Sequence, residues 1–147
     1  MITLHNSRTK NFNNNGLGIL KDCISAKVCE VLNGEFNINI TYPVGGYLYP
    51  NLVEDNIIVT DVGYGKRQAF RIKNVSKRLD NIEVYATHIF YDLNDNLIED
   101  IYPKGQTGET VINYILSHAQ YEHNFIGYSN ITKTSTARYI RKNLVES

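Results

Sequence analysis

The sequence has no excess of charge of either sign, few cysteines and no long apolar run. Its 147 residues include fifteen basic and fifteen acidic side chains, so the formal net charge is zero. Nucleic-acid-binding proteins usually carry a basic excess, because phosphate neutralisation supplies most of their affinity. The balance therefore argues against a specific nucleic-acid partner. We interpret the local basic cluster of Arg138, Arg141 and Lys142, with Lys133 upstream, as a solvated face.

No apolar run approaches the ~20 residues that a membrane-spanning helix needs. The first ten residues also lack the apolar core of a signal peptide. We therefore expect no membrane insertion, and synthesis in the cytoplasm.

The only cysteines are Cys23 and Cys29. If both lay on one extended strand, their separation would be ~20 Å at ~3.3 Å per residue. A disulfide tolerates Cα separations only up to roughly 7 Å. Two cysteines without a C-x-x-C pair also make no zinc site. The sequence predicts free, buried thiols.

Alternation of apolar and polar residues predicts a first hairpin. Residues 24–28 alternate, and a change of phase at Val31 predicts a bulge near Glu30. Asn33-Gly34 then fits a two-residue type I′ turn. An unbroken alternation over residues 36–42 follows, and Pro43 ends it.

Further short strands are expected on both sides of this hairpin. They are Ile2–Leu4, residues 57–62, the stretch around Phe70–Lys73, and residues 82–86, with turns at residues 63–66 and 80–81. Such spacing predicts a small antiparallel β-barrel or sandwich.

The character of the chain changes after His88. Residues 90–106 are acidic and turn-rich, and Thr107 is the expected N-cap of a helix that ends near residues 118–120. Its apolar face would comprise Val111, Ile112, Ile115, Leu116 and Ala119. Two further strands are predicted at 125–131 and 137–140, followed by the first turn of another helix at 143–147.

The predicted fold is mainly β with some α, an α+β chain in two parts. Residues 1–88 would form a β-barrel domain. Residues 89–147 would begin a second, mixed α+β domain that is truncated.

Histidine is the first candidate for chemistry. His88 has the same parity as Ile82, Val84 and Ala86, so we interpret it as a core histidine that points inward rather than as a catalytic base. His118 and His123 are five residues apart, whereas a helical metal-binding pair is four apart. We expect no metal there.

Carboxylates cluster between residues 92 and 100. Such acids can perform acid–base chemistry or bind calcium, and Asp92-x-Asn94-x-Asn96 resembles the opening of an EF-hand loop. However, Leu97 replaces the required glycine and Pro103 the required glutamate. We interpret the cluster as a solvated turn; its members are Asp92, Asp95, Glu99 and Asp100.

Two other sequence motifs were considered, and neither matches a functional site. Gly63-Tyr64-Gly65-Lys66 has Gln68 where a dinucleotide fingerprint has its third glycine, and no helix is expected after it. No serine lies in a G-x-S-x-G elbow. We therefore predict no catalytic, cofactor-binding or metal-binding residues and no cofactor.

Five ordered stretches carry a resemblance to a known family. They are Gly16–Asp22; Glu30–Phe36, leading to Tyr42-Pro43; Gly65–Ile72; Glu83–Leu93; and Ala137–Asn143. Together they resemble the N-terminal part of the tail endopeptidase, or tail-associated lysin, proteins of siphophages and prophages of Gram-positive bacteria.

The resemblance implies a fold similar to the baseplate hub of contractile tails, where β-barrel domains form a ring that closes the tail tube. It implies a structural protein of the virion tail tip, assembled in the host bacterial cytoplasm, that supports host attachment and DNA delivery. The implied partners are a homotrimer of the chain, the distal tail and tape measure proteins, and the host cell-wall surface. The family's lytic activity lies in C-terminal extensions, so we expect no enzyme here.

Other functions remain open at this stage. One is an enzyme whose site combines His88, His118 and the acidic turn, and a related one is a fragment of a cell-wall-degrading tail endopeptidase. Another is a receptor- or cell-wall-carbohydrate-binding module that stacks sugars on Tyr42, Tyr47, Tyr49 and Tyr64.

Overall fold

The computed structural model describes residues 1–63 and 65–145. The chain divides into two compact units, Met1–Ile89 (unit 1) and Phe90–Ser147 (unit 2). Each unit is described by itself. The fold is mainly β and antiparallel with a smaller helical part, as the sequence predicts. Within the described residues, no helix is both long and apolar enough to cross a membrane.

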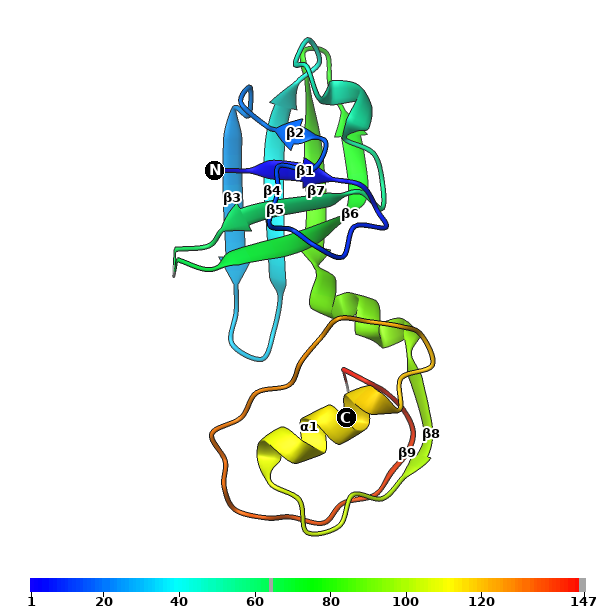
Figure 1. The fold of residues 1–147 in the computed structure, drawn as a ribbon. Helices are drawn as coiled ribbons and strands as arrows, with labels where there is room; N and C mark the ends of the chain where they lie inside the picture. The colour runs from blue at the N-terminus through cyan, green and yellow to red at the C-terminus, as the bar shows by residue number, and fades with distance from the viewer. Residues whose placement is uncertain (64, 146–147) are drawn as a thin grey trace. The chain divides into compact units, whose positions relative to one another are not determined.

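Unit 1 is one curled antiparallel sheet that forms a half-barrel (Figure 1). Its seven strands lie in the order β2-β1-β5-β6-β7-β4-β3. Their bounds are β1 Thr3–His5, β2 Gly18–Ile19, β3 Ser25–Glu30, β4 Phe36–Pro43, β5 Ile57–Asp61, β6 Arg67–Lys77 and β7 Asn81–His88, and a short 3-10 helix, η1, spans Tyr49–Asn51.

The concave face of this sheet holds the main core. On β4 and β7 every second residue is buried, because a strand with one covered face repeats with period two. Phe70 at the centre is fully buried. The core residues are Leu4, Leu20, Ile38, Ile40, Tyr42, Leu48, Leu52, Ile58, Phe70, Ile72, Ile82, Val84 and Ala86.

The β3–β4 hairpin differs from the prediction in two ways. Its register is continuous from Ser25↔Thr41 to Glu30↔Phe36, so the bulge predicted near Glu30 is wrong. The predicted two-residue type I′ turn is also wrong. The connection spans five residues, with the Gly34 N–H donating to the Val31 carbonyl. Only Asn33 of the predicted pair has a positive φ (56°), so the backbone strain lies at Asn33.

The irregularity of this sheet lies instead in β6. Its register against β7 shifts between Ile72 and Asn74. A bulge bends a strand and increases its twist. An eleven-residue strand that bends here can pair with both β5 and β7 along a curled sheet.

Unit 2 combines one helix with a two-stranded sheet. Its elements are the 3-10 helix η2 Ile89–Asp95, which begins at the last residue of unit 1, β8 Leu97–Ile101, α1 Gly108–Ser117 and β9 Tyr139–Asn143, with β8 antiparallel to β9. The core residues are Leu93, Ile98, Ile101, Ile115, Leu116 and Leu144. Thr107 precedes α1 in extended conformation, as an N-cap does, although its side chain caps no α1 backbone N–H.

Three sequence predictions for unit 2 are wrong. The acidic stretch 90–106 contains a strand, β8, in place of a continuous turn. Residues 125–131 join no sheet. The predicted strand at 137–140 is displaced to Tyr139–Asn143, so Asn143 ends a strand rather than starting a helix. The rest of that predicted helical turn includes residues 146–147, which lie outside the described residues.

Candidate functional site

His88 lies at the end of β7, where its ring is enclosed by aromatic neighbours. It stacks on Phe36 with ring centroids 4.6 Å apart and meets Phe70 edge-on at 5.5 Å. Its Nε2 donates a hydrogen bond to the Gln68 side-chain oxygen, 2.8 Å away. The ring is half-buried and faces the core with Ile82 and its neighbours. His88 thus serves packing, as the sequence predicts.

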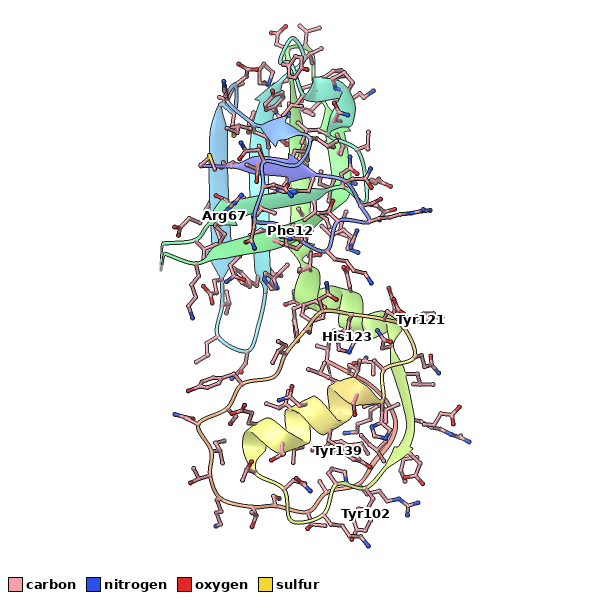
Figure 2. All side chains as sticks on the ribbon, in the orientation of Figure 1. Phe12, Arg67, Tyr102, Tyr121, His123 and Tyr139 are labelled. Atoms are coloured by element: carbon pink, nitrogen blue, oxygen red, sulfur yellow. The ribbon has the colours of Figure 1, made fainter. Side chains whose placement is uncertain are left out.

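His118 and His123 both cap the end of α1. His118 Nδ1 donates to the Tyr114 carbonyl (2.8 Å), and His123 Nε2 donates to the Leu116 carbonyl (2.9 Å). The other nitrogen of His123 accepts the Phe125 N–H at 3.2 Å. Carbonyls at a helix C-terminus lack intrahelical partners, so these rings satisfy them. Figure 2 shows His123 in unit 2.

The acidic stretch is dispersed over two elements. Asp92 and Asp95 lie in η2, whereas Glu99 and Asp100 lie on β8. Buried Asn96 uses its Oδ1 to accept the Tyr121 N–H at 2.8 Å, so it holds a loop. In residues 1–63 and 65–145, no three His, Cys, Asp or Glu side chains gather to hold a metal ion.

The basic cluster is likewise divided. Arg138 forms a bidentate pair with Asp100, with Nε 2.8 Å from Oδ1, and this pair links the segment before β9 to β8. Bonding to Arg138 lowers the pKa of the Asp100 carboxyl below its ordinary value. Arg141 and Lys142 are exposed on β9.

The four tyrosines proposed as a stacking platform do not share one surface. Tyr42 is fully buried, and its hydroxyl donates to the Asp22 carboxylate (3.1 Å) and accepts the Leu48 N–H (3.3 Å). Burial raises the pKa of this phenol. Tyr47 is 86% exposed, Tyr49 packs against the core, and Tyr64 lies outside the described residues. The Tyr42 ring therefore cannot stack on a sugar.

The two cysteines are free, but they are half-buried rather than buried, and only Cys29 lies on β3. Cys23 precedes that strand. Burial raises the pKa of the Cys23 thiol, whose Sγ lies 3.2 Å from the Ser25 carbonyl oxygen. A raised thiol pKa disfavours the reactive thiolate.

An extended segment, residues 124–132, runs along helix α1 in unit 2. The Asn113 side chain on α1 accepts the Gly127 N–H and donates to the Gly127 carbonyl, both at 2.9 Å. Four residues later the Ile131 carbonyl accepts the Gly108 N–H at 3.1 Å. The amide of Asn113 thus takes the place of a neighbouring strand, since a paired residue exchanges both of its main-chain bonds.

The outward side of this segment is apolar and open. Ile126, Tyr128 and Ile131 are 87%, 82% and 60% exposed, and Gly127 between them is buried. No charged residue occurs from Asn124 to Thr132. Within the described part of the chain, the main-chain groups of Ile126 and Tyr128 make no hydrogen bond. We call these three apolar side chains the unit 2 strip.

A buried polar cluster in unit 1 was missed in the sequence. Thr3 and His5 are fully buried on β1, and the Arg67 guanidinium donates to the Thr3 hydroxyl at 2.6 Å. Arg67 lies 64 residues from Thr3, so no local motif joins them. The available signal was only that Thr3 and His5 share one face of a strand.

No protein-family description matches this chain, and no curated protein matches it.

Proposed function

We propose that this chain is a structural component of a phage or prophage tail tip, in the region of the baseplate hub. In this role it closes the tail tube and supports host attachment and DNA delivery. The proposal includes a homotrimer in the virion and contacts with the distal tail and tape measure proteins. It rests first on the five ordered stretches that resemble tail endopeptidase proteins, and the curled antiparallel half-barrel is compatible with a tail-tip β-domain.

Within the structure, the unit 2 strip is the observation that supports the proposed contacts with other proteins. Exposed apolar side chains gathered in one short segment favour a contact site, because their burial against another protein removes them from water. In the described part of the chain, the main-chain groups of Ile126 and Tyr128 also make no hydrogen bond. The segment that contains them, residues 124–132, has no charged residue, and charged residues are one means by which proteins prevent strand pairing at an open edge. These are properties of a surface that another protein covers.

The polar side chains considered for catalysis support the same role. His88 is held between Phe36 and Phe70, and His118 and His123 complete the hydrogen bonding of α1. Each of these rings stabilises its own unit. We therefore propose a structural role, in which no residue of the chain acts as a catalyst.

Labelling of virions tests this proposal. Antibodies are raised against the purified chain, prophages are induced in the bacterium that encodes it, and immunogold particles are located by electron microscopy. We expect label at the tail tip, and none after the antibodies are absorbed with purified chain. Label on capsids, or virions without label although the protein is present in the lysate, would contradict the proposal.

A degradation assay separates the enzymatic alternative. Purified chain is incubated with peptidoglycan, and soluble fragments are measured for the wild type and for His88→Gln. We expect no release above buffer for either protein. Release by the wild type that His88→Gln abolishes would replace the structural proposal with an enzymatic one.

A further inference from the structure

The chain that follows β1 forms a strap over the convex face of the unit 1 sheet. We define the strap as residues 6–15. Phe12 of the strap packs against a second apolar cluster, Ile57, Val59 and Ala69, on β5 and β6. The strap therefore covers apolar surface on the side of the sheet away from the main core.

Two arginines of β6 hold the strap by its main chain. Arg67 donates to the Phe12 carbonyl and Arg71 to the Ser7 carbonyl, both at 3.1 Å. Figure 2 shows Arg67 beside Phe12 in unit 1. Arg71 also donates to the Asp55 carbonyl at 2.8 Å. Hydrogen bonds from a charged donor are stronger than those from a neutral donor. The strap is therefore firmly held as long as β6 stays in place.

His5 lies beneath this strap with no exposed surface. Its Nε2 is 3.0 Å from the Thr3 hydroxyl, and its ring meets Phe12 edge-on at 5.4 Å. The other nitrogen, Nδ1, is buried without a hydrogen-bond partner. Gly16 lies against it so closely that a Cβ there would be 2.5 Å from Nδ1. This side of the ring is thus closely packed.

Protonation of this ring has no compensation in the folded state. An imidazolium donates from both nitrogens, so a new N–H at Nδ1 would be buried without an acceptor. The Thr3 hydroxyl at Nε2 already accepts a bond from Arg67, whose positive charge faces the ring from β6. Burial first, and Arg67 second, lower the pKa of His5.

No carboxylate is among the groups that shift the pKa of His5. On β5, Asp61 is paired with Arg67 in register, and its carboxylate accepts the Gly63 N–H at 2.8 Å. The charged residues of the strap, Arg8 and Lys10, are both basic and exposed. The charged group that acts on the His5 ring is therefore the Arg67 guanidinium.

We propose that protonation of His5 releases β1 and the strap from β5 and β6, so that unit 1 has an acid-sensitive N-terminal segment. The opened form uncovers Ile57 and Val59 and leaves β5 as an open edge strand. This inference does not depend on the tail-tip proposal.

The direction of the pH effect follows from linkage. The released ring has the ordinary His pKa of 6.5, whereas the closed ring has a lower one. Below about pH 6.5 the open form binds a proton that the closed form does not, so the closed form loses stability as the pH falls. From pH 7.5 to pH 5 the opening constant rises by up to about 30-fold, because pH 5 lies 1.5 pH units below the open-state pKa.

Hydrogen exchange of the whole chain tests the proposal. Exchange is followed by mass spectrometry from pH 7.5 to pH 5, corrected for the intrinsic pH dependence of amide exchange. We expect the protection of residues 1–16 to fall by up to about 30-fold, with peptides of β4 and β7 unchanged. An equal loss of protection in all strands would indicate global unfolding. Unchanged protection of residues 1–16 would show that this segment is not acid-sensitive. Either result overturns the proposal.

His5→Gln assigns the effect to this ring, because glutamine is neutral throughout the range and can place its amide near Thr3. We expect this variant to lose the acid-dependent opening, whereas the control His118→Gln, on the exposed His118, keeps it. The opposite pattern would overturn the proposal.

If His5→Gln does not fold, proton NMR of the wild-type rings replaces it. The His5 signal of the closed form should titrate below the ordinary His pKa of 6.5. Titration of that signal near pH 6.5 would overturn the proposal.

Discussion

In unit 1 the loops are tied back to the sheet by polar side chains, whereas in unit 2 a long segment leaves its apolar side chains uncovered. Arg67, Arg71 and the Tyr42 hydroxyl each hold loop backbone in unit 1. In unit 2 Asn113 holds residues 124–132 by one glycine, and Ile126 and Tyr128 point outward. Both units leave apolar side chains exposed, Leu32 and Leu79 of unit 1 among them, but in unit 2 three such side chains lie within one short segment.

The difference lies in how the main-chain groups of each unit find hydrogen-bond partners. A seven-stranded sheet pairs most of its main-chain groups internally. A two-stranded sheet with one helix offers few strands with which another segment can form main-chain hydrogen bonds. A segment with strand-like alternation and no neighbouring strand keeps open main-chain groups and exposed side chains. We interpret unit 2 as the part of the chain that depends most on contact with another protein.

The largest effect is expected at the centre of unit 1. Phe70 is fully buried and contacts Phe36 and His88, so Phe70→Ala removes a large side chain from both contacts. We expect a loss of about 3–5 kcal/mol in the free energy of unfolding, measured by urea titration. The control Leu79→Ala, at a residue 93% exposed, should change it by less than about 0.5 kcal/mol. Equal effects would refute our assignment of the core.

The next effect tests how the loop after β4 is held. A Cβ at Gly46 would lie 2.3 Å from the buried Tyr42 ring, whereas a Cβ at the adjacent Gly45 meets nothing within 4 Å. Gly46→Ala should therefore cost about 1–3 kcal/mol, because the Tyr42 ring has no room to move. Gly45→Ala is the matched control and should be near neutral in the same urea titration. If both variants unfold alike, the loop does not rest on Tyr42.

A smaller effect is expected from acid in unit 2. Arg138 lowers the pKa of Asp100 in the fold below its ordinary 3.8, so the pair stabilises the fold above about pH 4. That stability is lost as the pH falls through the lowered pKa. Arg138→Gln should remove this part of the acid dependence, as followed by NMR of β8 and β9 between pH 5 and pH 2. Lys142→Gln on the same strand is the control, and an unchanged profile in Arg138→Gln would contradict the pairing.

The smallest effect on stability is expected at the unit 2 strip. Ile126→Ser with Tyr128→Ser alters side chains that are already in water, so the free energy of unfolding should change by less than about 0.5 kcal/mol. Incorporation into virions, measured by immunoblot of purified particles, should nevertheless be lost. The matched control is Leu32→Ser with Leu79→Ser in unit 1, where both residues are more than 90% exposed. Normal incorporation of the strip variant would show that this surface is not the contact.

Sequence alternation predicted β4 and β7 because each has one covered face, which imposes period two on residues 36–42 and 82–86. The helix after Thr107 was also predicted, and Ile115 and Leu116 of its expected apolar face are buried, whereas Ile112 of that face is 37% exposed. Residues 125–131 show the limit of such patterns. Their alternation is real, with Gly127 buried between exposed neighbours, but a strand requires a hydrogen-bonded partner that local sequence does not specify.

The buried cluster at His5 could not be predicted for a related reason. Its contacts join β1 to Arg67 and to a strap residue, Phe12, and these lie far apart in sequence or within an Asn-rich stretch that reads as a loop. The tyrosine platform was wrong because parity places Tyr42 with the inward-facing residues of β4, and its hydroxyl finds buried partners there. Side chains that bind across the fold thus escape analysis of neighbouring residues.

The position of β1 in the sheet also fixes an order of events during synthesis. Strand β1 pairs with β5, with Thr3 opposite Val59 and His5 opposite Ile57. The ribosome makes this partner strand more than fifty residues after β1. The β3–β4 hairpin closes within twenty residues and can form first. Closing the longer loop costs more chain entropy, which places β1 among the late steps of folding. During synthesis β1 emerges before β5 and must wait for it before this pairing can form.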